Sequence, residues 1–170
     1  PVSILNPDEV MYHFVTGFTS KLAGTEVGVT EPQATFSACF GDPFMSQKPH
    51  VYAGLLAKRM ADFDTRCILL NTGWTGGPYG TGSRMSLKHT RSLLNAALGG
   101  EFDDIDLETQ PILNLRMPTT CSNVPDEILN PRSTWDNPED YDQQAKKLRE
   151  MFRENYLKKG FAELGIAAAM

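Results

Sequence analysis

Residues 67–82 read CILLNTGWTGGPYGTG, a short apolar run followed directly by a glycine-rich loop. Four consecutive apolar residues with polar neighbours on both sides predict a buried strand at Cys67–Leu70. Glycines placed after such a strand let backbone N–H groups approach a phosphate or a base closely. A tight turn across the edge of a sheet explains the same glycines equally well. The stretch therefore predicts an α/β arrangement and leaves the ligand open.

Residues 77–84 come close to the phosphate-loop pattern GxxxxGK(S/T) but depart from it where the chemistry lies. Ser83 stands where a lysine would reach the β and γ phosphates, and Arg84 takes the hydroxyl position. Pro78 has no backbone N–H to donate. The loop therefore fails as a triphosphate cradle.

Helix-start signals lie on both sides of this centre. Residues 6–9 (NPDE) and 137–140 (NPED) each combine a capping asparagine, a proline at the first helical position and two acids. After the second signal, apolar residues at helical spacing predict a long amphipathic helix. Its expected buried face consists of Tyr141, Ala145, Leu148, Phe152 and Tyr156.

Two further helices and a strand are expected between these signals. Pro49 begins one helix, whose expected buried stripe is Val51, Leu55, Leu56 and Met60. Residues 90–98 form the other, with Gly99 as a left-handed cap. Leu113, Leu115 and Met117 alternate with polar residues, as on a half-buried strand. The elements together predict an α/β fold with a mixed sheet and flanking helices, in one domain or part of one.

Composition limits the function classes. The chain has 170 residues, 41% of them hydrophobic and 22% charged, which is typical of a folded globular protein. A net charge of −5 argues against a nucleic-acid partner, and no apolar run is long enough for a membrane helix. The three cysteines, Cys39, Cys67 and Cys121, are far apart and fit a reducing compartment, so we expect a cytoplasmic protein.

One basic segment is a candidate binding site. Residues 84–91 read RMSLKHTR, with four potentially basic groups in eight positions. A guanidinium can stack on a planar base as well as pair with a phosphate, which favours an anionic or planar ligand. The alternative is a solvated charged face that leads into a helix with Thr90 as its cap.

No metal site is predicted. His13, His50 and His89 lack the spacing of metal ligands and are interpreted as helix-surface or capping residues. Cys39 lies in an apolar stretch and is interpreted as packing, with a nucleophilic role as the alternative. The acidic residues Asp103, Asp104, Asp106 and Glu108 lack the full pattern of a calcium loop and predict a solvated turn.

Five ordered segments closely resemble one family. They are FVTGFTSKLAGTE (14–26), EPQATFSACFG (31–41), NTGWTGG (71–77), GTGSRMSLKHTR (80–91) and ILNPRSTW (128–135). Through these segments, from Pro1 to about Phe152, the chain resembles ATP-dependent phosphoenolpyruvate carboxykinase. The family enzyme is much longer, so the resemblance implies its C-terminal, nucleotide-binding part. The first residue, Pro1, is consistent with a piece of a longer chain.

The resemblance implies a reaction of gluconeogenesis. Oxaloacetate loses CO2 to give an enolate, which takes the γ-phosphoryl group of ATP and yields phosphoenolpyruvate and ADP. Metal ions (Mg²⁺ and Mn²⁺), a phosphate loop and basic residues supply the charge neutralisation that this step requires. In the family these groups lie upstream of the segment that resembles Pro1. No metal ligand and no catalytic residue is therefore assigned in this chain.

The family's adenine-contacting residues correspond to Arg84, Met85 and Thr90. The resemblance also implies a mobile lid over residues 17–35, with Gly17, Gly24 and Gly28 as flex points. The chain departs from the family at two positions. Val27 stands where a basic lid residue is common, and Ser83 replaces a lysine that often precedes the matching arginine.

Two other interpretations remain. The first is a truncated, non-catalytic nucleotide-binding or regulatory protein that keeps the adenine pocket and the lid. The second is an unrelated structural α/β module whose glycine loop only turns the chain. Phosphate-loop and metal-ligand residues upstream of Pro1 would distinguish the carboxykinase from the first of these.

Overall fold

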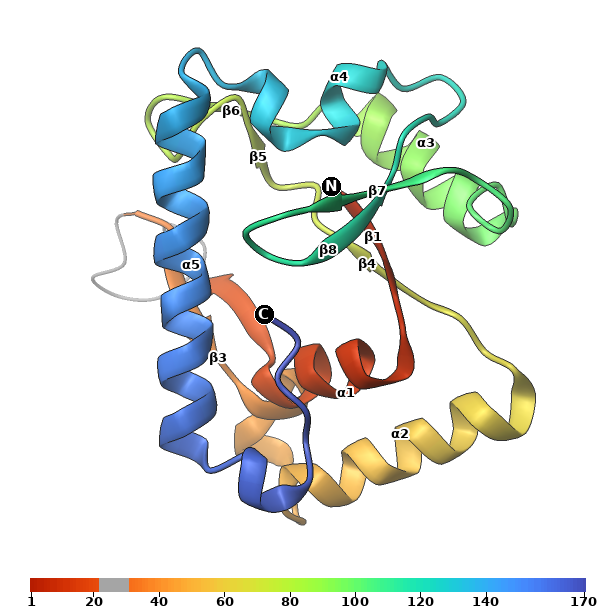
Figure 1. Ribbon diagram of the computed structural model, residues 1–170, viewed down its shortest axis with the longest axis vertical. Coiled ribbons are helices and arrows are strands. Elements are labelled where there is room, and N and C mark those ends of the chain that lie inside the picture. The colour runs from red at the N-terminus through yellow and green to blue at the C-terminus, as the bar shows by residue number, and fades with distance from the viewer. Residues whose placement is uncertain (22–30) are drawn as a thin grey trace. The chain divides into compact units, whose positions relative to one another are not determined.

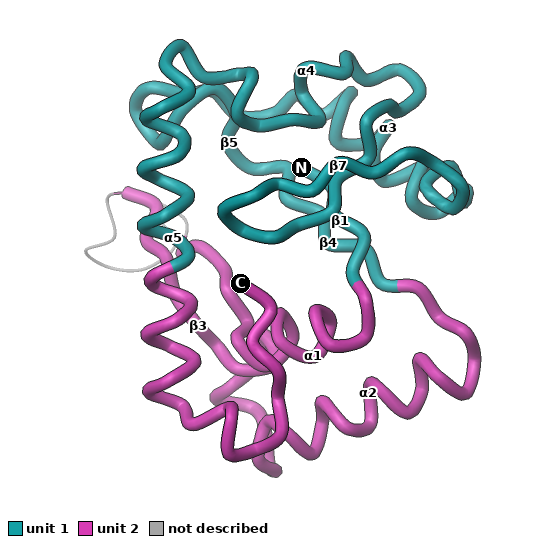
Figure 2. The backbone as a smooth tube through the Cα atoms, viewed as in Figure 1, with its two compact units in different colours: residues 1–5, 67–149 teal, residues 6–66, 150–170 magenta. Residues whose placement is uncertain are grey.

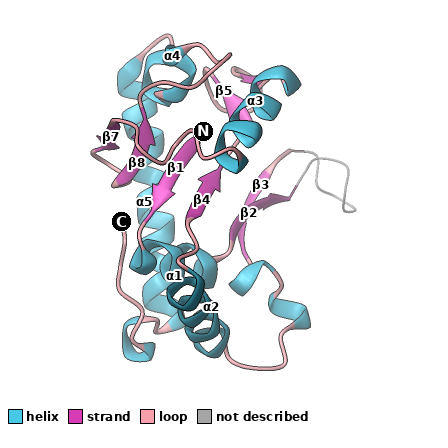
Figure 3. Ribbon diagram, turned by 90° about the vertical axis from the view of Figure 1, so that its right-hand side faces the viewer, coloured by secondary structure: helices cyan, strands magenta, loops and turns pink. Residues whose placement is uncertain are grey.

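The computed structural model describes residues 1–21 and 31–170 (Figure 1). The chain divides into two compact units, the first made of residues 1–5 and 67–149 and the second of residues 6–66 and 150–170 (Figure 2). Helices and strands occur in both units (Figure 3), which confirms the predicted α/β fold. The strands of the described residues form small, two-stranded antiparallel sheets.

Three strand pairs build the first unit. The strand β1 (Val2–Leu5) pairs with β4 (Cys67–Leu70), and β7 (Leu107–Gln110) pairs with β8 (Leu115–Pro118). The short strands β5 (Trp74–Thr75) and β6 (Ser83–Arg84) flank the glycine loop. The strand expected at residues 67–70 therefore exists, but it is only half-buried and Leu70 is exposed. The reason is that β4 belongs to a two-stranded sheet rather than to the interior of a larger one.

Helix α3 (Leu87–Leu98) packs on these strands through Leu93 and Ala96. The hydrophobic core around them consists of Val2, Met85, Phe102, Cys121, Val124 and Leu129. Two expectations about this helix are wrong. It begins at Leu87, before Thr90, because the Ser86 hydroxyl caps it by accepting a hydrogen bond from the His89 N–H at 3.2 Å. Gly99 has φ −82°, and the left-handed residue is Gly100, with φ +77°.

The chain of the first unit continues through α4 (Asp126–Leu129) into α5 (Pro138–Lys159), which extends into the second unit. The start of α5 at Pro138 confirms the second helix-start signal. On its expected buried face, Tyr141, Ala145 and Phe152 are buried and Leu148 and Tyr156 are half-buried. The predicted strand around residues 113–117 begins only at Leu115, since Leu113 lies in the turn between β7 and β8.

The second unit contains α1 (Pro7–Thr16), the hairpin of β2 (Phe18–Lys21) and β3 (Gln33–Phe36), α2 (Pro49–Phe63) and the end of α5. Helix α1 starts as predicted: the Asn6 side chain accepts from the Glu9 N–H at 3.0 Å, and the Glu9 carboxylate accepts from the Asn6 N–H at 2.7 Å. Packed aromatic rings fill the core of this unit; they belong to Tyr12, Phe18, Phe36, Phe152 and Tyr156.

The predicted stripe of α2 is partly wrong, and so is the placement of one histidine. Met60 is buried as predicted and Leu56 is half-buried, but Val51 and Leu55 are 40% and 56% exposed. Ala53 is buried as well. Ala53 and Met60 are seven residues apart and share one face of the helix, which is the face that α2 buries. His13 is a buried residue rather than a helix-surface one, because its ring packs edge-on against Tyr12 and Phe152.

The segment expected to form a lid is only partly described. Gly24, Val27 and Gly28 lie outside the described residues. Residues 18–21 and 33–36 are paired strands rather than irregular loop. Gly17 ends α1 with φ +53°, and a Cβ at this position would lie 1.7 Å from the Ser37 carbonyl oxygen. Close packing thus surrounds the backbone at Gly17, and the lid over residues 17–35 stays a prediction.

Candidate functional site

The hairpin of β5 and β6 carries the glycine loop, and its two strands are in direct register. Trp74 lies opposite Arg84, and Thr75 lies opposite Ser83. At the far end the loop closes on itself, because the Thr81 and Gly82 N–H groups donate to the Pro78 carbonyl at 3.1 and 2.8 Å. Those two N–H groups are used within the loop, consistent with a loop that is not a phosphate cradle.

Gly82 is required by the close approach of the two strands. A Cβ at this position would lie 2.3 Å from the Gly77 carbonyl oxygen and 2.6 Å from that of Thr75. Real Cβ atoms do not come this close to backbone oxygens, so a side chain here would force the loop open. Gly77, on the other side of the loop, has φ +147°, a conformation that favours glycine.

Thr134 ties the loop to a segment far away in the sequence. Its hydroxyl accepts hydrogen bonds from the Gly76 N–H at 3.1 Å and the Thr75 hydroxyl at 3.2 Å, and donates to the Pro131 carbonyl at 2.8 Å. One hydroxyl thereby uses its single donor and both of its acceptor positions. The segment 128–135 is thus joined to the glycine loop.

The three residues predicted to contact adenine lie on consecutive elements. Arg84 ends β6 and is exposed, and Thr90 lies half-buried in the first turn of α3. Met85 lies between them, but its side chain is 9% exposed and belongs to the core with Val2 and Leu93. The structure therefore brings Arg84 and Thr90 to the surface and turns Met85 inward.

The surface at the start of α3 is basic. Arg84, Lys88 and Arg91 are exposed. Within residues 1–21 and 31–170, none of the three side chains has a hydrogen-bond or ion-pair partner. The N-terminus of the helix adds a partial positive charge to this surface. Anionic groups would meet unneutralised cations here, although the chain as a whole is acidic.

Two aromatic residues of the hairpin, one of them opposite Arg84, were missed by the sequence analysis. Trp74 and Tyr79 are 40% and 48% exposed, and their ring centroids are 5.4 Å apart with the planes at 87°. A signal for them existed, because both interrupt a loop that otherwise consists of small and turn-forming residues.

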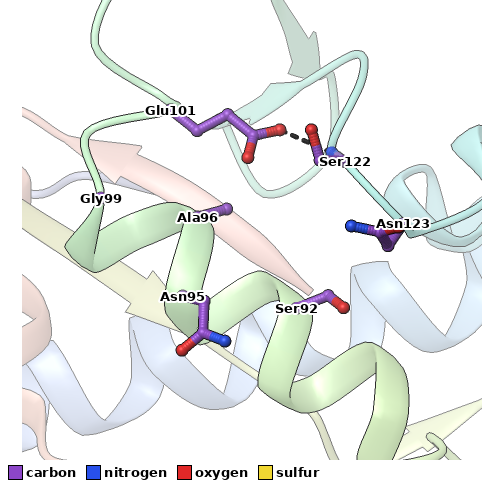
Figure 4. A pocket seen from close by; sticks show the side chains of 7 residues that line it. All are labelled: Ser92, Asn95, Ala96, Gly99, Glu101, Ser122 and Asn123. Carbon is purple, nitrogen blue, oxygen red and sulfur yellow. Dashed lines mark hydrogen bonds between the residues drawn. The ribbon is translucent and has the colours of Figure 1, made fainter.

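Two cavities lie in the first unit. One, of about 230 Å³, is lined by Ser92 and Asn95 of α3 and by Glu101, Ser122 and Asn123, and the Glu101 carboxylate accepts a hydrogen bond from the Ser122 N–H (Figure 4). The other, of about 540 Å³, lies between the glycine loop and the start of α5. Its lining is Gly76, Gly77, Pro78, Thr81, Trp135, Asp136, Asn137, Asp140, Gln143, Gln144 and Lys147. Arg84, Met85 and Thr90 line neither cavity.

Cys39 and His13, the remaining candidates for chemistry, lie in environments that disfavour their charged forms. Burial raises the pKa of the Cys39 thiol, and its sulfur lies 3.8 Å from the Pro49 carbonyl oxygen. Burial lowers the pKa of His13, and the nearby Glu9 carboxylate opposes this shift. In the described part of the chain, no three His, Cys, Asp or Glu side chains are placed to hold a metal ion. In the same part, no helix is both long and apolar enough to cross a membrane.

Comparison with known proteins assigns the family. Residues 1–127 match the family model described as phosphoenolpyruvate carboxykinase. The chain is 55% identical to phosphoenolpyruvate carboxykinase (ATP) from Alkaliphilus oremlandii and 52% identical to that from Caldanaerobacter subterraneus subsp. tengcongensis. It is 54% identical to phosphoenolpyruvate carboxykinase (ATP) 1 from Moorella thermoacetica. Each alignment covers 93% of this chain and 30% of the relative, so the chain spans about a third of the relatives' length. The chain belongs to the family of ATP-dependent phosphoenolpyruvate carboxykinases.

Proposed function

We propose that this chain forms the C-terminal, nucleotide-binding part of an enzyme that converts oxaloacetate and ATP to phosphoenolpyruvate, ADP and CO2. The observation that carries the proposal is the exposed Arg84 at the end of β6, which has no partner among the described residues, within a chain that belongs to this family. A guanidinium held on a short hairpin can stack on a base and still attract a phosphate.

Each site residue has a distinct role in this proposal. The Arg84 guanidinium contacts the adenine, and the Thr90 hydroxyl, one turn into α3, hydrogen-bonds to the edge of the base. Met85 contributes through its position rather than its side chain. Its N–H donates to the Gly73 carbonyl at 2.9 Å and its side chain anchors β6 in the core. The residue that follows Arg84 is therefore anchored in the core, which holds the backbone of Arg84 in place.

The family implies a divalent metal, and the described residues do not fit one. They contain no group of three His, Cys, Asp or Glu side chains suited to a metal ion. We propose that the ligands for Mg²⁺ or Mn²⁺, like the residues that contact oxaloacetate, belong to other parts of the enzyme. This chain's contribution is to bind and orient the nucleoside end of ATP, and residues 17–35 serve as the lid that excludes water.

In the cell, we propose a cytoplasmic enzyme of gluconeogenesis, with neither nucleic acid nor membrane as a partner. The alternative is a short nucleotide-binding protein without its own catalytic groups. The relatives are about three times as long as this chain, which favours the enzyme.

The test is an activity assay on the polypeptide isolated from its natural source, together with its intact mass. The proposal predicts ATP-dependent formation of phosphoenolpyruvate from oxaloacetate by a polypeptide several times heavier than this chain. A mass equal to that of the 170 residues, with ATP binding but no turnover, would establish the short binding protein instead.

A further inference from the structure

We propose that Trp74 and Tyr79 form an aromatic wall that stacks on the purine ring of the bound nucleotide, beside Arg84. This inference rests on the proposed function, since it assumes that the base binds at the β5–β6 hairpin. It adds a stacking surface and a preference for large bases to a site so far defined by Arg84, Met85 and Thr90.

The register of the hairpin places the two groups on one face. Trp74 and Arg84 are directly opposite each other on antiparallel strands. Side chains of directly opposed residues project from the same face of the pair, with Cβ atoms about 4.5–5.5 Å apart. A planar ligand that contacts the guanidinium of Arg84 therefore lies within reach of the Trp74 ring.

Part of the ring surface of Trp74 and Tyr79 remains exposed to solvent. Tyr79 meets Trp74 in a T-shaped contact, with centroids 5.4 Å apart and planes at 87°. An edge-to-face contact uses the face of only one of its two rings. Trp74 is 40% and Tyr79 is 48% exposed, although large aromatic side chains are usually well buried. A flat apolar ligand would cover this surface.

The wall is held in position by its surroundings. Thr134 fixes the start of the loop at Thr75 and Gly76, next to Trp74. The loop then folds back through the bonds from Thr81 and Gly82 to Pro78, which brings Tyr79 against Trp74. A surface held this way loses little conformational entropy when it binds a base.

The chemistry selects for a purine nucleotide. Stacking of a base on an aromatic side chain depends on the overlapping area rather than on hydrogen bonds, so the larger purine ring gains more from it than a pyrimidine. Arg84, which lies opposite Trp74, and the exposed Lys88 and Arg91 of α3 supply the positive charge that a phosphorylated ligand requires. An uncharged apolar ligand would give these three positive charges no anionic group to interact with.

The experiment measures nucleotide binding by the complete polypeptide that carries this segment. For Trp74→Leu we expect the Kd of ATP to rise about tenfold while the Kd of inorganic tripolyphosphate stays unchanged. Trp74→Phe keeps an aromatic face and should lose much less. Discrimination between ATP and CTP should fall in Trp74→Leu, because the smaller pyrimidine overlaps less with the wall.

Two controls separate stacking from damage to the fold. Trp135→Leu removes the other tryptophan of the chain, which lies outside the hairpin and packs on Tyr141, and should leave the Kd of ATP unchanged. Fluorescence gives a direct signal: ATP should quench the wild type more than Trp74→Phe. The proposal that the two rings stack on the base would be contradicted by an unchanged Kd of ATP in Trp74→Leu. It would also be contradicted by an equal loss of affinity for ATP and for tripolyphosphate.

The outcomes also distinguish this inference from the proposed function. If Arg84→Ala weakens ATP binding and Trp74→Leu does not, the adenine site stands and the aromatic wall is wrong. If neither substitution changes the Kd of ATP, the base binds elsewhere and both fail.

Discussion

The Thr134 hydroxyl accepts a hydrogen bond from the Gly76 N–H at 3.1 Å, across 58 residues of sequence. The same hydroxyl also bonds to the Thr75 hydroxyl and the Pro131 carbonyl. This contact explains why two segments that resemble the carboxykinase family, the glycine loop and residues 128–135, belong to one structural feature. The position of the loop, and with it that of Trp74 and Arg84, depends on a residue outside the hairpin.

Thr134→Val should loosen the glycine loop. Valine has a similar shape but leaves the Gly76 N–H without its partner, which costs about 1–3 kcal/mol of unfolding free energy if the N–H remains buried. We expect a lower midpoint of thermal unfolding and weaker ATP binding, measured by calorimetry. Thr134→Ser keeps the hydroxyl and should retain most of both. A Thr134→Val variant as stable as wild type would show that the hydrogen bonds of the Thr134 hydroxyl do not stabilise the loop.

Gly82→Ala should open the hairpin. The new Cβ would lie 2.3 Å from the Gly77 carbonyl oxygen, so one of the two strands must move. We expect a loss of thermal stability and of ATP affinity. The matched control is Gly54→Ala in α2, where a Cβ meets no atom within 4 Å and φ is not positive. That control should raise stability by about 0.5–1 kcal/mol, because alanine favours a helix over glycine. Equal effects of the two substitutions would contradict the packing described.

His13 should make the second unit less stable in acid. Burial among Tyr12 and Phe152 lowers the pKa of His13 below the ordinary 6.5, despite the opposing Glu9 carboxylate. The unfolded chain therefore binds a proton at a higher pH than the folded one does. His13 therefore leaves the free energy of unfolding unchanged above pH 6.5 and lowers it progressively as the pH falls below 6.5.

Denaturant unfolding of wild type and His13→Gln at pH 8 and pH 5.5 tests this dependence. The wild type should lose more stability between the two pH values than the variant does. If both lose the same amount, other groups cause the acid sensitivity and the ring of His13 is not selectively held neutral.

The thiols should react slowly in the folded protein. Burial raises the pKa of Cys39, Cys67 and Cys121, so little thiolate is present at neutral pH. Alkylation by iodoacetamide, followed by mass spectrometry, should proceed first at Cys67, the one that is half-buried rather than buried. Rapid, selective alkylation of Cys39 would instead support the nucleophilic role that was its alternative interpretation.

Local signals predicted the helix starts well. The capping asparagines, with proline and two acids after them, identified the beginnings of α1 and α5, because a helix start depends on a few adjacent residues. The start of α3 was placed too late. Both Ser86 and Thr90 can cap a helix, and only the packing of the following turn decides between them.

Long-range contacts were not predictable from local patterns. The strand β1 pairs with β4 across the whole of α1 and α2, and neither strand contains a turn signal that points to the other. The expected stripe of α2 followed helical spacing, but the face that is buried depends on where the rest of the unit lies. The basic segment of the candidate site could be identified from sequence, and the two aromatic residues of the glycine loop stood out there as well. The contact between the aromatic rings and the hydrogen bonds to Thr134 could not be predicted, because they depend on how the loop folds back.

The central claim is tested most directly by calorimetric titration of ATP into the complete polypeptide and its Arg84→Ala variant. The control is Arg149→Ala, which removes an exposed arginine of α5. We predict that the Kd of ATP rises at least about fivefold in Arg84→Ala, by analogy with the loss of a stacked or charge-assisted contact, and stays unchanged in Arg149→Ala. Oxaloacetate binding should be unaffected in both. Equal ATP affinity in Arg84→Ala and wild type would contradict an adenine site at this hairpin.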